Sequence, residues 1–361
     1  MSYSPLRHIS SVFWKHDPVQ FTFFLTRKCN ARCPFCFYLS RKNGPPEPEL
    51  TLDEIRKVSD SLGRLLWLAF SGGEVYLRKD LVEITATFYE RNKPAIILLS
   101  TNGLLPNTIQ EQTEAILKHC TKSTVAVKLS LDGPEEVHDR LRGVPGAFHK
   151  TLETYEKLRP LLDRYRNFEL GINSVFCSAN QGSMDELIMF VHGLKGIRTH
   201  TVSLVRGDVA DEGLKHVDID TYRRTIEKLE SNLKAHPFAR YRFPGARLKA
   251  AQDVLQRRLI HDTMQKKRRM IPCYAGKLTL VLTEAGDLYP CESFAQKMGN
   301  VREWGYDIKK LFAGNDAQAA LHAVKHSGCF CTHECYMMMN ILFNARLHPA
   351  MLKEYLQLSS S

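Results

Sequence analysis

The sequence lacks any uninterrupted apolar run near the roughly 18 residues that cross a bilayer, and its first residues hold no apolar stretch of signal-peptide length. It also lacks internal repeats, and its only low-complexity segment is the serine run 359–361. With 43% hydrophobic and 25% charged residues, the composition excludes a disordered or collagen-like chain. We therefore expect a soluble, cytoplasmic globular protein without a membrane-spanning segment.

Charge and length leave several classes of partner open. Fifty Lys and Arg residues against 39 Asp and Glu residues give a net charge of +11. This balance permits nucleic acid, phosphorylated substrates or an anionic membrane surface as partners, but it identifies none of them. The 361 residues suffice for about two to three domains, or for one large α/β unit with an appendage.

Strand-like runs alternate with helix-like stretches through the first two thirds of the chain. The runs are rich in β-branched and aromatic residues and cover 19–25, 65–70, 95–100, 124–131, 168–176 and 199–205. This alternation is typical of βαβ units around a parallel sheet, and six units indicate a partial barrel. Asn102-Gly103 and Asp132-Gly133 follow strands directly, at the carboxyl edge where active sites of such sheets lie.

Cysteine is unusually frequent and unevenly distributed. Eight of the ten cysteines form two groups, which are Cys29, Cys33 and Cys36 near the start and Cys273, Cys291, Cys329, Cys331 and Cys335 near the end. Such clustering in a cytoplasmic chain indicates metal–thiolate chemistry rather than disulfides. The isolated Cys120 and Cys177 lie within apolar patterns, so we assign them to core packing.

The first group, Cys29-x-x-x-Cys33-x-x-Cys36, begins just past the first predicted strand. Three thiolates can hold three irons of a [4Fe–4S] cube and leave the fourth iron open, whereas ferredoxin runs supply four. A zinc knuckle, the alternative, would need four nearby ligands. The loop resembles that of the radical S-adenosylmethionine (radical SAM) superfamily, which usually has an aromatic residue before its last cysteine, as Phe35 is here.

The resemblance implies an enzyme with S-adenosylmethionine (SAM) and a catalytic [4Fe–4S] cluster as cofactors, and with Cys29, Cys33 and Cys36 as catalytic ligands. In that family the open iron binds SAM, and one electron cleaves it to methionine and a 5′-deoxyadenosyl radical. The radical abstracts a hydrogen from an unactivated carbon, which no side chain can do unaided. A low-potential donor such as flavodoxin or ferredoxin is the implied electron source.

Ser71-Gly72-Gly73-Glu74 lies at the end of the second predicted strand and looks like the GGE motif of the same family. The resemblance implies that glycine permits close backbone approach, and that the glutamate side of the turn holds the ammonium group of SAM. By itself, Gly-Gly-Glu is also an ordinary strand-to-helix turn.

Four further residues match cofactor-binding positions of similar enzymes. Ser130 and Arg142, after the fourth strand, imply contacts with the ribose and with the carboxylate of SAM. Asn173 on the fifth strand and Val205 at the sixth imply contacts with ribose and adenine. For each of them, a structural role as a hydrogen-bonded core or surface residue is the alternative.

The second group resembles the opening of the SPASM and twitch extensions of radical SAM enzymes, which carry auxiliary clusters. Cys273 and Cys291 flank a predicted hairpin whose turn contains Gly286. Five cysteines are too few for two fully ligated clusters, so one auxiliary [4Fe–4S] cluster in a twitch-like domain is expected. Which four of the five cysteines ligate the auxiliary cluster stays open. Among Cys329, Cys331 and Cys335, Cys335 is the one most strongly expected to be a ligand. A Cys₄ zinc site, or a Cys₃His site with His333, is the alternative.

The predicted architecture is α/β, a partial (β/α)6 radical SAM barrel followed by a smaller twitch-like α+β domain of a β-hairpin and helices. The boundaries are an extension at 1–15, the barrel at 16–235, a basic helical connector at 236–270 and the auxiliary cluster domain at 271–361. A stretch rich in Met, Leu and Tyr from 336 to 356 is interpreted as core packing, with a membrane-surface contact as the alternative.

The leading functional hypothesis is hydrogen abstraction from a ribosomally made peptide. The barrel begins within about twenty residues of the start, which leaves no room for the leader-binding domain of many similar enzymes. The same chemistry on a small-molecule, lipid or phosphorylated intermediate is the alternative, and the net charge favours it mildly. A non-catalytic iron–sulfur sensor of nucleic acid is the distant alternative, because a sensor has no use for an open cluster site. The bond formed, the fate of SAM and the oligomeric state are not determined by the sequence.

Overall fold

The computed structural model describes residues 2–38, 47–235, 240–243 and 245–358. One nine-stranded sheet with the order β6-β5-β4-β3-β2-β1-β7-β8-β9 forms its centre. The strands are β1 (Gln20–Phe24), β2 (Trp67–Ser71), β3 (Ile96–Thr101), β4 (Thr124–Ser130), β5 (Phe168–Phe176), β6 (Thr199–Leu204), β7 (Thr279–Leu282), β8 (Asp287–Tyr289) and β9 (Gly299–Asn300). The first six coincide with the six predicted runs, and β1 to β6 pair in parallel, which confirms the predicted α/β class.

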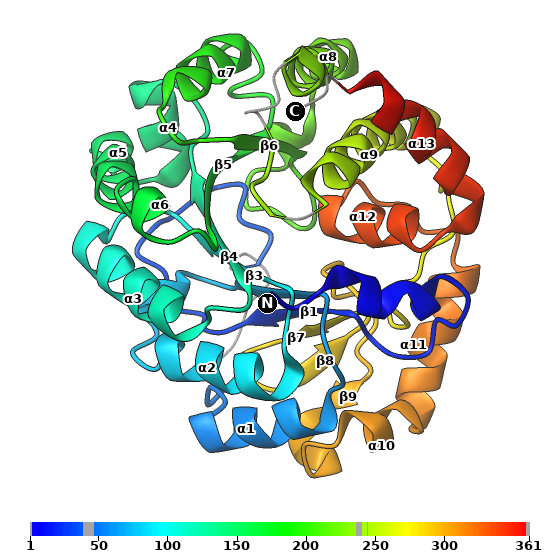
Figure 1. The fold of residues 1–361 in the computed structure, drawn as a ribbon. Helices are drawn as coiled ribbons and strands as arrows, with labels where there is room; N and C mark the ends of the chain where they lie inside the picture. Colours follow the sequence, from blue (N-terminus) through cyan, green and yellow to red (C-terminus); the bar gives the residue numbers. More distant parts are fainter. Residues whose placement is uncertain (1, 39–46, 236–239, 244, 359–361) are drawn as a thin grey trace.

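Helices cover the outside of the curved sheet (Figure 1). Those of the first two thirds are η1 (Pro5–Val12), α1 (Leu52–Ser61), η2 (Val75–Leu77), α2 (Leu81–Asn92), α3 (Pro106–His119), α4 (Glu135–Arg142), α5 (Ala147–Leu158), α6 (Leu161–Arg164), α7 (Met184–Gly193), η3 (Glu212–Lys215) and α8 (Ile219–Ala235). The remaining ones are α9 (Ala246–Lys266), η5 (Val301–Trp304), α10 (Ile308–Phe312), α11 (Asn315–His326), α12 (Glu334–Leu342), η6 (Ala345–Leu347) and α13 (His348–Gln357).

Alternation along the strands separates the core from an interior cavity. Phe21 and Phe23 of β1 point outward and pack on Phe88 of α2, with ring centroids 5.8 and 6.3 Å apart. Thr22 between them lines the cavity inside the curved sheet. Because side chains alternate across a strand, the aromatic residues seal the sheet against the helices while small residues leave its inner side hollow.

The C-terminal third extends the same sheet. β7 pairs in parallel with β1, and β7 and β8 form the predicted antiparallel hairpin, with Gly286 in its turn at φ 90°. α9 and α12 contact each other and contribute Lys249, Asp253 and Met338 to the lining of the cavity. The predicted connector 236–270 lies partly outside the described residues, and the domain boundaries stay predictions. Among the described residues, no helix has the length and apolar character to span a bilayer.

Candidate active site

The first cysteine group lies on the loop after β1 and opens into the interior cavity. Cys29, Cys33 and Cys36 all line this cavity, whose volume is about 310 Å³. The Cys36 amide donates to the Cys33 carbonyl at 3.1 Å, which forms a tight turn between two of the thiols. Burial, with the charges of Asp132, Cys36 and Cys29, raises the pKa of Cys33 to about 11, although Arg142 acts in the opposite direction. A cationic iron centre would stabilise these thiolates, so the donor set fits a cluster.

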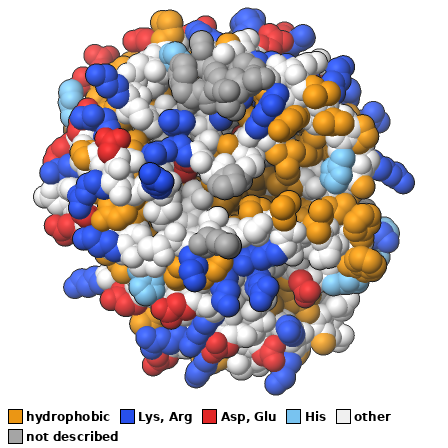
Figure 2. Space-filling view, in the orientation of Figure 1, with side chains coloured by type: hydrophobic (Ala, Val, Ile, Leu, Met, Phe, Trp, Pro, Cys, Tyr) orange, Lys and Arg blue, Asp and Glu red, His pale blue; other side chains and the backbone are white. Residues whose placement is uncertain are grey.

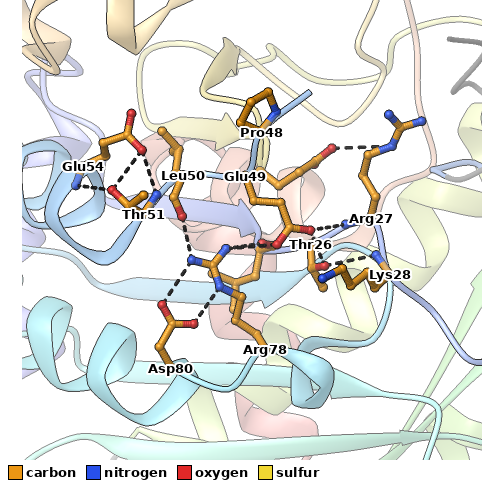
Figure 3. Close-up of polar contacts among 12 residues, drawn as sticks. Thr26, Arg27, Lys28, Pro48, Glu49, Leu50, Thr51, Glu54, Arg78 and Asp80 are labelled. Atoms are coloured by element: carbon orange, nitrogen blue, oxygen red, sulfur yellow. Dashed lines mark hydrogen bonds and ion pairs between the residues drawn. The ribbon is translucent and has the colours of Figure 1, made fainter. Parts of the chain in front are cut away.

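A polar network holds the strand end that precedes this loop (Figure 3). Arg78 donates to the Leu25 carbonyl at 3.0 Å and to the Leu50 carbonyl at 2.6 Å, and Asp80 orients its guanidinium from 2.7 Å. Thr26 donates to Glu49 at 2.6 Å. These bonds fix the backbone at the carboxyl end of β1, from which the cysteine loop departs.

The Gly72-Gly73 turn packs directly on the backbone in front of Cys29. The Gly73 amide donates to the Thr26 carbonyl at 2.8 Å, and the Glu74 amide donates to the Lys28 carbonyl at 2.8 Å. A Cβ atom on Gly73 would lie 2.1 Å from the Lys28 oxygen. Gly72 has φ 122°, which favours glycine. Both glycines line the cavity.

Gly73→Ala is therefore expected to separate the turn from the cysteine loop. Overpacking of this kind costs about 1–3 kcal/mol of stability, and the shifted loop would bind iron less completely. Gly63→Ala is the matched control, because its Cβ would meet nothing within 4 Å. Thermal unfolding and iron content measure both variants. Equal values for the two variants would show that the close approach at Gly73 is unimportant.

The Glu74 carboxylate turns away from the cavity. It is buried and accepts from Thr101 Oγ1 at 2.8 Å and from the Asn102 amide at 2.8 Å. Burial raises its pKa to about 7, although these donors act in the opposite direction. Asn102 in turn places its Nδ2 3.8 Å from Cys29 Sγ. The Glu74 carboxylate thus acts on the site through Asn102. The expected contact between this turn and the SAM ammonium stays a prediction, and the backbone of the turn is the part that could make it.

A buried ion pair joins the ends of β4 and α4 to the cysteine loop. Arg142 Nη2 lies 2.5 Å from Asp132 Oδ2, and Arg142 Nη1 lies 3.7 Å from Cys33 Sγ. Asp132 also accepts from the Val175 amide at 2.8 Å. The Arg142 guanidinium sits 5.3 Å from the ring of Phe35. Its Nε is buried with no partner among the described residues, and the side chain lines the cavity.

The structure brings the remaining predicted cofactor residues to the same cavity. Phe35, Ser130, Asn173 and Val205 all line it. Ser203 Oγ lies 3.5 Å from Asn173 Oδ1, which orients the amide across neighbouring strands. Of the predicted site residues near the first cysteine group, Glu74 alone is not among the cavity-lining side chains that the structure describes. Their roles toward ribose and adenine stay predictions.

In the second cysteine group, the charges of Cys273, Cys291 and Cys329 act on neighbouring thiols. Cys329 and Cys331 are exposed, and desolvation by surrounding atoms, with the charges of Cys273 and Cys291, raises the pKa of Cys331. Burial, with the charge of Cys329, raises the pKa values of Cys273 and Cys291. Cys335 instead lies on α12, lines the barrel cavity, and has Glu292 and Glu334 as charged neighbours. Which four of these five cysteines ligate a cluster, and whether Cys335 is one of them, stays a prediction.

Arg206, at the end of β6, lies between the two cysteine groups. Its guanidinium sits 5.3 Å from the ring of Phe37, next to Cys36, and its Nη2 lies 3.0 Å from His333 Nε2. Arg206 also pairs with Glu334 at 3.6 Å, and His333 contacts Glu292 at 2.5 Å. Sequence reasoning assigned no role to Glu292 or Glu334, although each is adjacent to a cysteine of the second group. Among the described residues, no three Cys, His, Asp or Glu side chains are grouped closely enough to hold a single metal ion.

Comparison with known proteins agrees with this geometry. Residues 23–174 match the model of the radical SAM superfamily. The chain is 27% identical to an AdoMet-dependent heme synthase of Methanosarcina barkeri over 295 residues, which is 77% of this chain and 78% of the relative. It is 24% identical to the subtilosin biosynthesis protein AlbA of Bacillus subtilis over 338 residues, which is 89% of this chain and 67% of the relative.

Solved structures show the same fold at low sequence identity. SuiB of Streptococcus suis bound to its precursor peptide SuiA superposes with a TM-score of 0.58 at 16% identity, over 88% of this chain and 70% of that chain. The enzyme anSMEcpe with bound AdoMet and a peptide superposes with a TM-score of 0.57 at 17% identity, over 94% and 100% of the two chains. Residues 23–174 thus match the radical SAM superfamily, and the solved structures share the fold of the chain.

Proposed function

We propose that Cys29, Cys33 and Cys36 hold a [4Fe–4S] cluster whose open iron binds SAM, and that the cavity beside them holds the substrate. The observation that carries this proposal is that three thiols, the Gly72-Gly73 backbone and Arg142 converge on one cavity. The bound cofactors supply the electron and the 5′-deoxyadenosyl radical that abstracts a substrate hydrogen. The chain itself binds and orients the substrate, and it excludes water from the cavity.

Residues of the chain fix the geometry around the cluster site. Asp132 holds the Arg142 guanidinium beside Cys33, which places a positive charge where a thiolate must form. Asn102 contacts Cys29 and donates to Asn30 at 2.7 Å, and Glu74 holds Asn102. Because Asp132 and Arg142, and likewise Glu74 and Asn102, are buried and bonded to each other, the loop is preorganised for its metal.

An auxiliary [4Fe–4S] cluster on Cys273, Cys291, Cys329 and Cys331 is the second part of the proposal. The mutual electrostatic influence of these four thiols supports it. The ion-pair network around Arg206 lies between them and the first group, in position to tune electron transfer between the two sites. A low-potential donor such as flavodoxin or ferredoxin would supply the first electron.

Metal analysis of the anaerobically reconstituted chain tests the auxiliary site. Two cubes require about eight irons per chain, whereas about four irons with one zinc would assign the second group to a zinc site. Cys331→Ala should lower the count to about four, while Cys335→Ala should leave it near eight. The reverse result would make Cys335 a ligand and Cys331 the spare thiol.

A peptide is the first candidate substrate. Its support is that the related SuiB is known in complex with its precursor peptide SuiA, and that AlbA serves the biosynthesis of a bacteriocin. The heme synthases among the relatives favour a small molecule instead. Deuterium transfer from a labelled candidate into 5′-deoxyadenosine decides between them, because only the true substrate donates the abstracted atom.

Lys128 favours an anionic small molecule as the second candidate. It is the only lysine among the described residues that is buried, at 7% exposure, and it lines the cavity. Its ammonium donates to Thr199 Oγ1 at 2.5 Å and fills the space that a Cβ atom on Gly171 would occupy. Within the described chain it has no carboxylate at ion-pair distance. An amine without a carboxylate partner in a substrate cavity suits a carboxylate or phosphate on the substrate, because an anion beside it favours its protonated form.

Lys128→Met is expected to stabilise the protein at neutral pH. Burial lowers the pKa of Lys128 to about 7 from 10.5, so between these values the unfolded chain binds a proton that the folded chain does not. The stability of the parent protein, relative to Lys128→Met, should therefore rise with pH by about 1 kcal/mol per unit from pH 7 to 10. Urea denaturation across this range measures the difference, and a flat difference would contradict the burial of a titrating amine.

A further inference from the structure

Large apolar side chains are exposed at one end of the molecule. Figure 2 shows hydrophobic side chains gathered over η1, α12 and α13. The most exposed, which we call the apolar patch, are Leu6 (74%), Ile9 (64%), Phe13 (72%), Trp14 (67%), Leu352 (57%) and Leu356 (70%). Six such residues are more than a packed monomer needs to expose, and a contiguous patch of this kind marks an interaction surface.

The apolar patch lies at the amino ends of the barrel strands, opposite the cysteine loop. The Tyr3 amide, just before η1, donates to the Lys122 carbonyl at 2.8 Å, and Arg7 of η1 donates to the Lys93 carbonyl. Lys93 and Lys122 immediately precede β3 and β4. Lys15, beside Trp14, lies 4.8 Å from the ring of Tyr274, in the segment that leads to β7. η1 therefore crosses this face, away from the carboxyl edge from which the cysteine loop departs.

The connections that enter the strands on this face are uniformly basic. The segments 62–66, 93–95, 120–123, 165–167 and 194–198 precede β2 to β6, and each contains Lys or Arg but neither Asp nor Glu. These cations, with the one before β7, form a basic rim of Arg64, Lys93, Lys122, Arg166, Lys195, Arg198 and Lys277. Cations near helix carboxyl ends also offset the helix dipoles. The exposed apolar patch beside them serves no such structural purpose.

We infer that this face docks on an anionic phospholipid surface, with the apolar patch entering the interface and the basic rim contacting the headgroups. Aliphatic side chains with a tryptophan at their edge suit the boundary between acyl chains and headgroups, and each cation near an anionic surface adds attraction. Nucleic acid would use the cations but not the leucines and isoleucine.

Vesicle sedimentation with the full chain tests the inference. Vesicles of about 70 mol% phosphatidylcholine and 30 mol% phosphatidylglycerol, in about 100 mM NaCl, should bind the protein, and pure phosphatidylcholine should bind it much more weakly. The double variant Phe13→Ser/Trp14→Ser should lose binding about tenfold or more. The triple variant Lys122→Gln/Arg166→Gln/Lys195→Gln should lose about fivefold per cation removed.

Matched control variants lie outside this face. Met189→Ser/Phe190→Ser removes two exposed apolar residues of α7, and Arg140→Gln/Arg223→Gln/Arg224→Gln removes three exposed cations of α4 and α8. Both should bind anionic vesicles like the parent protein, and circular dichroism checks that every variant is folded. Equal binding to the two vesicle types, or equal losses in the control variants, would overturn the inference. So would a salt-sensitive complex with a DNA duplex that only the triple variant loses, or a dimer in light scattering that Phe13→Ser/Trp14→Ser dissociates.

Discussion

Cys33→Ala is expected to abolish the formation of 5′-deoxyadenosine by the reduced, reconstituted protein, with a loss of about 10³-fold or more. Cys33 lines the cavity together with Cys29 and Cys36, and its sulfur lies beside the Arg142 guanidinium. A loop with two thiols cannot hold the cube in a defined position, and no other side chain supplies this chemistry. Chromatography of the nucleoside product, with iron analysis of the same sample, measures both losses.

Cys120→Ala is the matched control for this change. Cys120 is fully buried at the end of α3 and belongs to the main hydrophobic core. It is part of neither cysteine group. Its replacement removes one buried sulfur atom but should leave iron content and nucleoside formation within about twofold of the parent, because Cys120 is not among the residues that line the cavity. Undiminished cleavage of SAM in Cys33→Ala would remove the catalytic assignment of the first group.

Asp132→Ala is expected to lower the free energy of unfolding by about 3–5 kcal/mol, because it leaves the Arg142 guanidinium buried without its counter-charge. Asp132 is fully buried, and Arg142 is 7% exposed. The substitution also removes the acceptor for the Val175 amide, which ties β4 to β5. Urea denaturation measures the loss, and iron content should fall with it, since Arg142 would no longer be held beside Cys33.

An exposed ion pair and a double variant make this result interpretable. Asp185→Ala removes the partner of Lys228, 3.5 Å away on the surface, and should cost less than about 1 kcal/mol. Asp132→Leu/Arg142→Met replaces both buried charges with apolar groups and should recover part of the stability lost in Asp132→Ala. If Asp132→Ala were no worse than Asp185→Ala, the buried pair would not hold the site together.

The fold could be predicted because its signals are local. Alternation of apolar residues at strand spacing is set by the pleat, so the runs at 20–24 and 168–176 were readable from residue order alone. The hairpin before Cys291 was equally legible, because a turn with Gly286 separates two short apolar runs. What the sequence did not predict is that β7 pairs with β1, since that neighbour is more than 250 residues away along the chain.

By itself the sequence determined the cysteine loop, the glycine turn and the parallel sheet, because each depends on residues within one turn or one strand. The tertiary structure alone decided which distant side chains meet. Arg206 reaches His333 and Glu334 across more than 120 residues, Glu74 turns from the cavity to hold Asn102, and Cys335 lines the barrel cavity. Burial likewise arises only when strands close around a space, and it places the Lys128 amine in the cavity, with no carboxylate of the described residues at ion-pair distance.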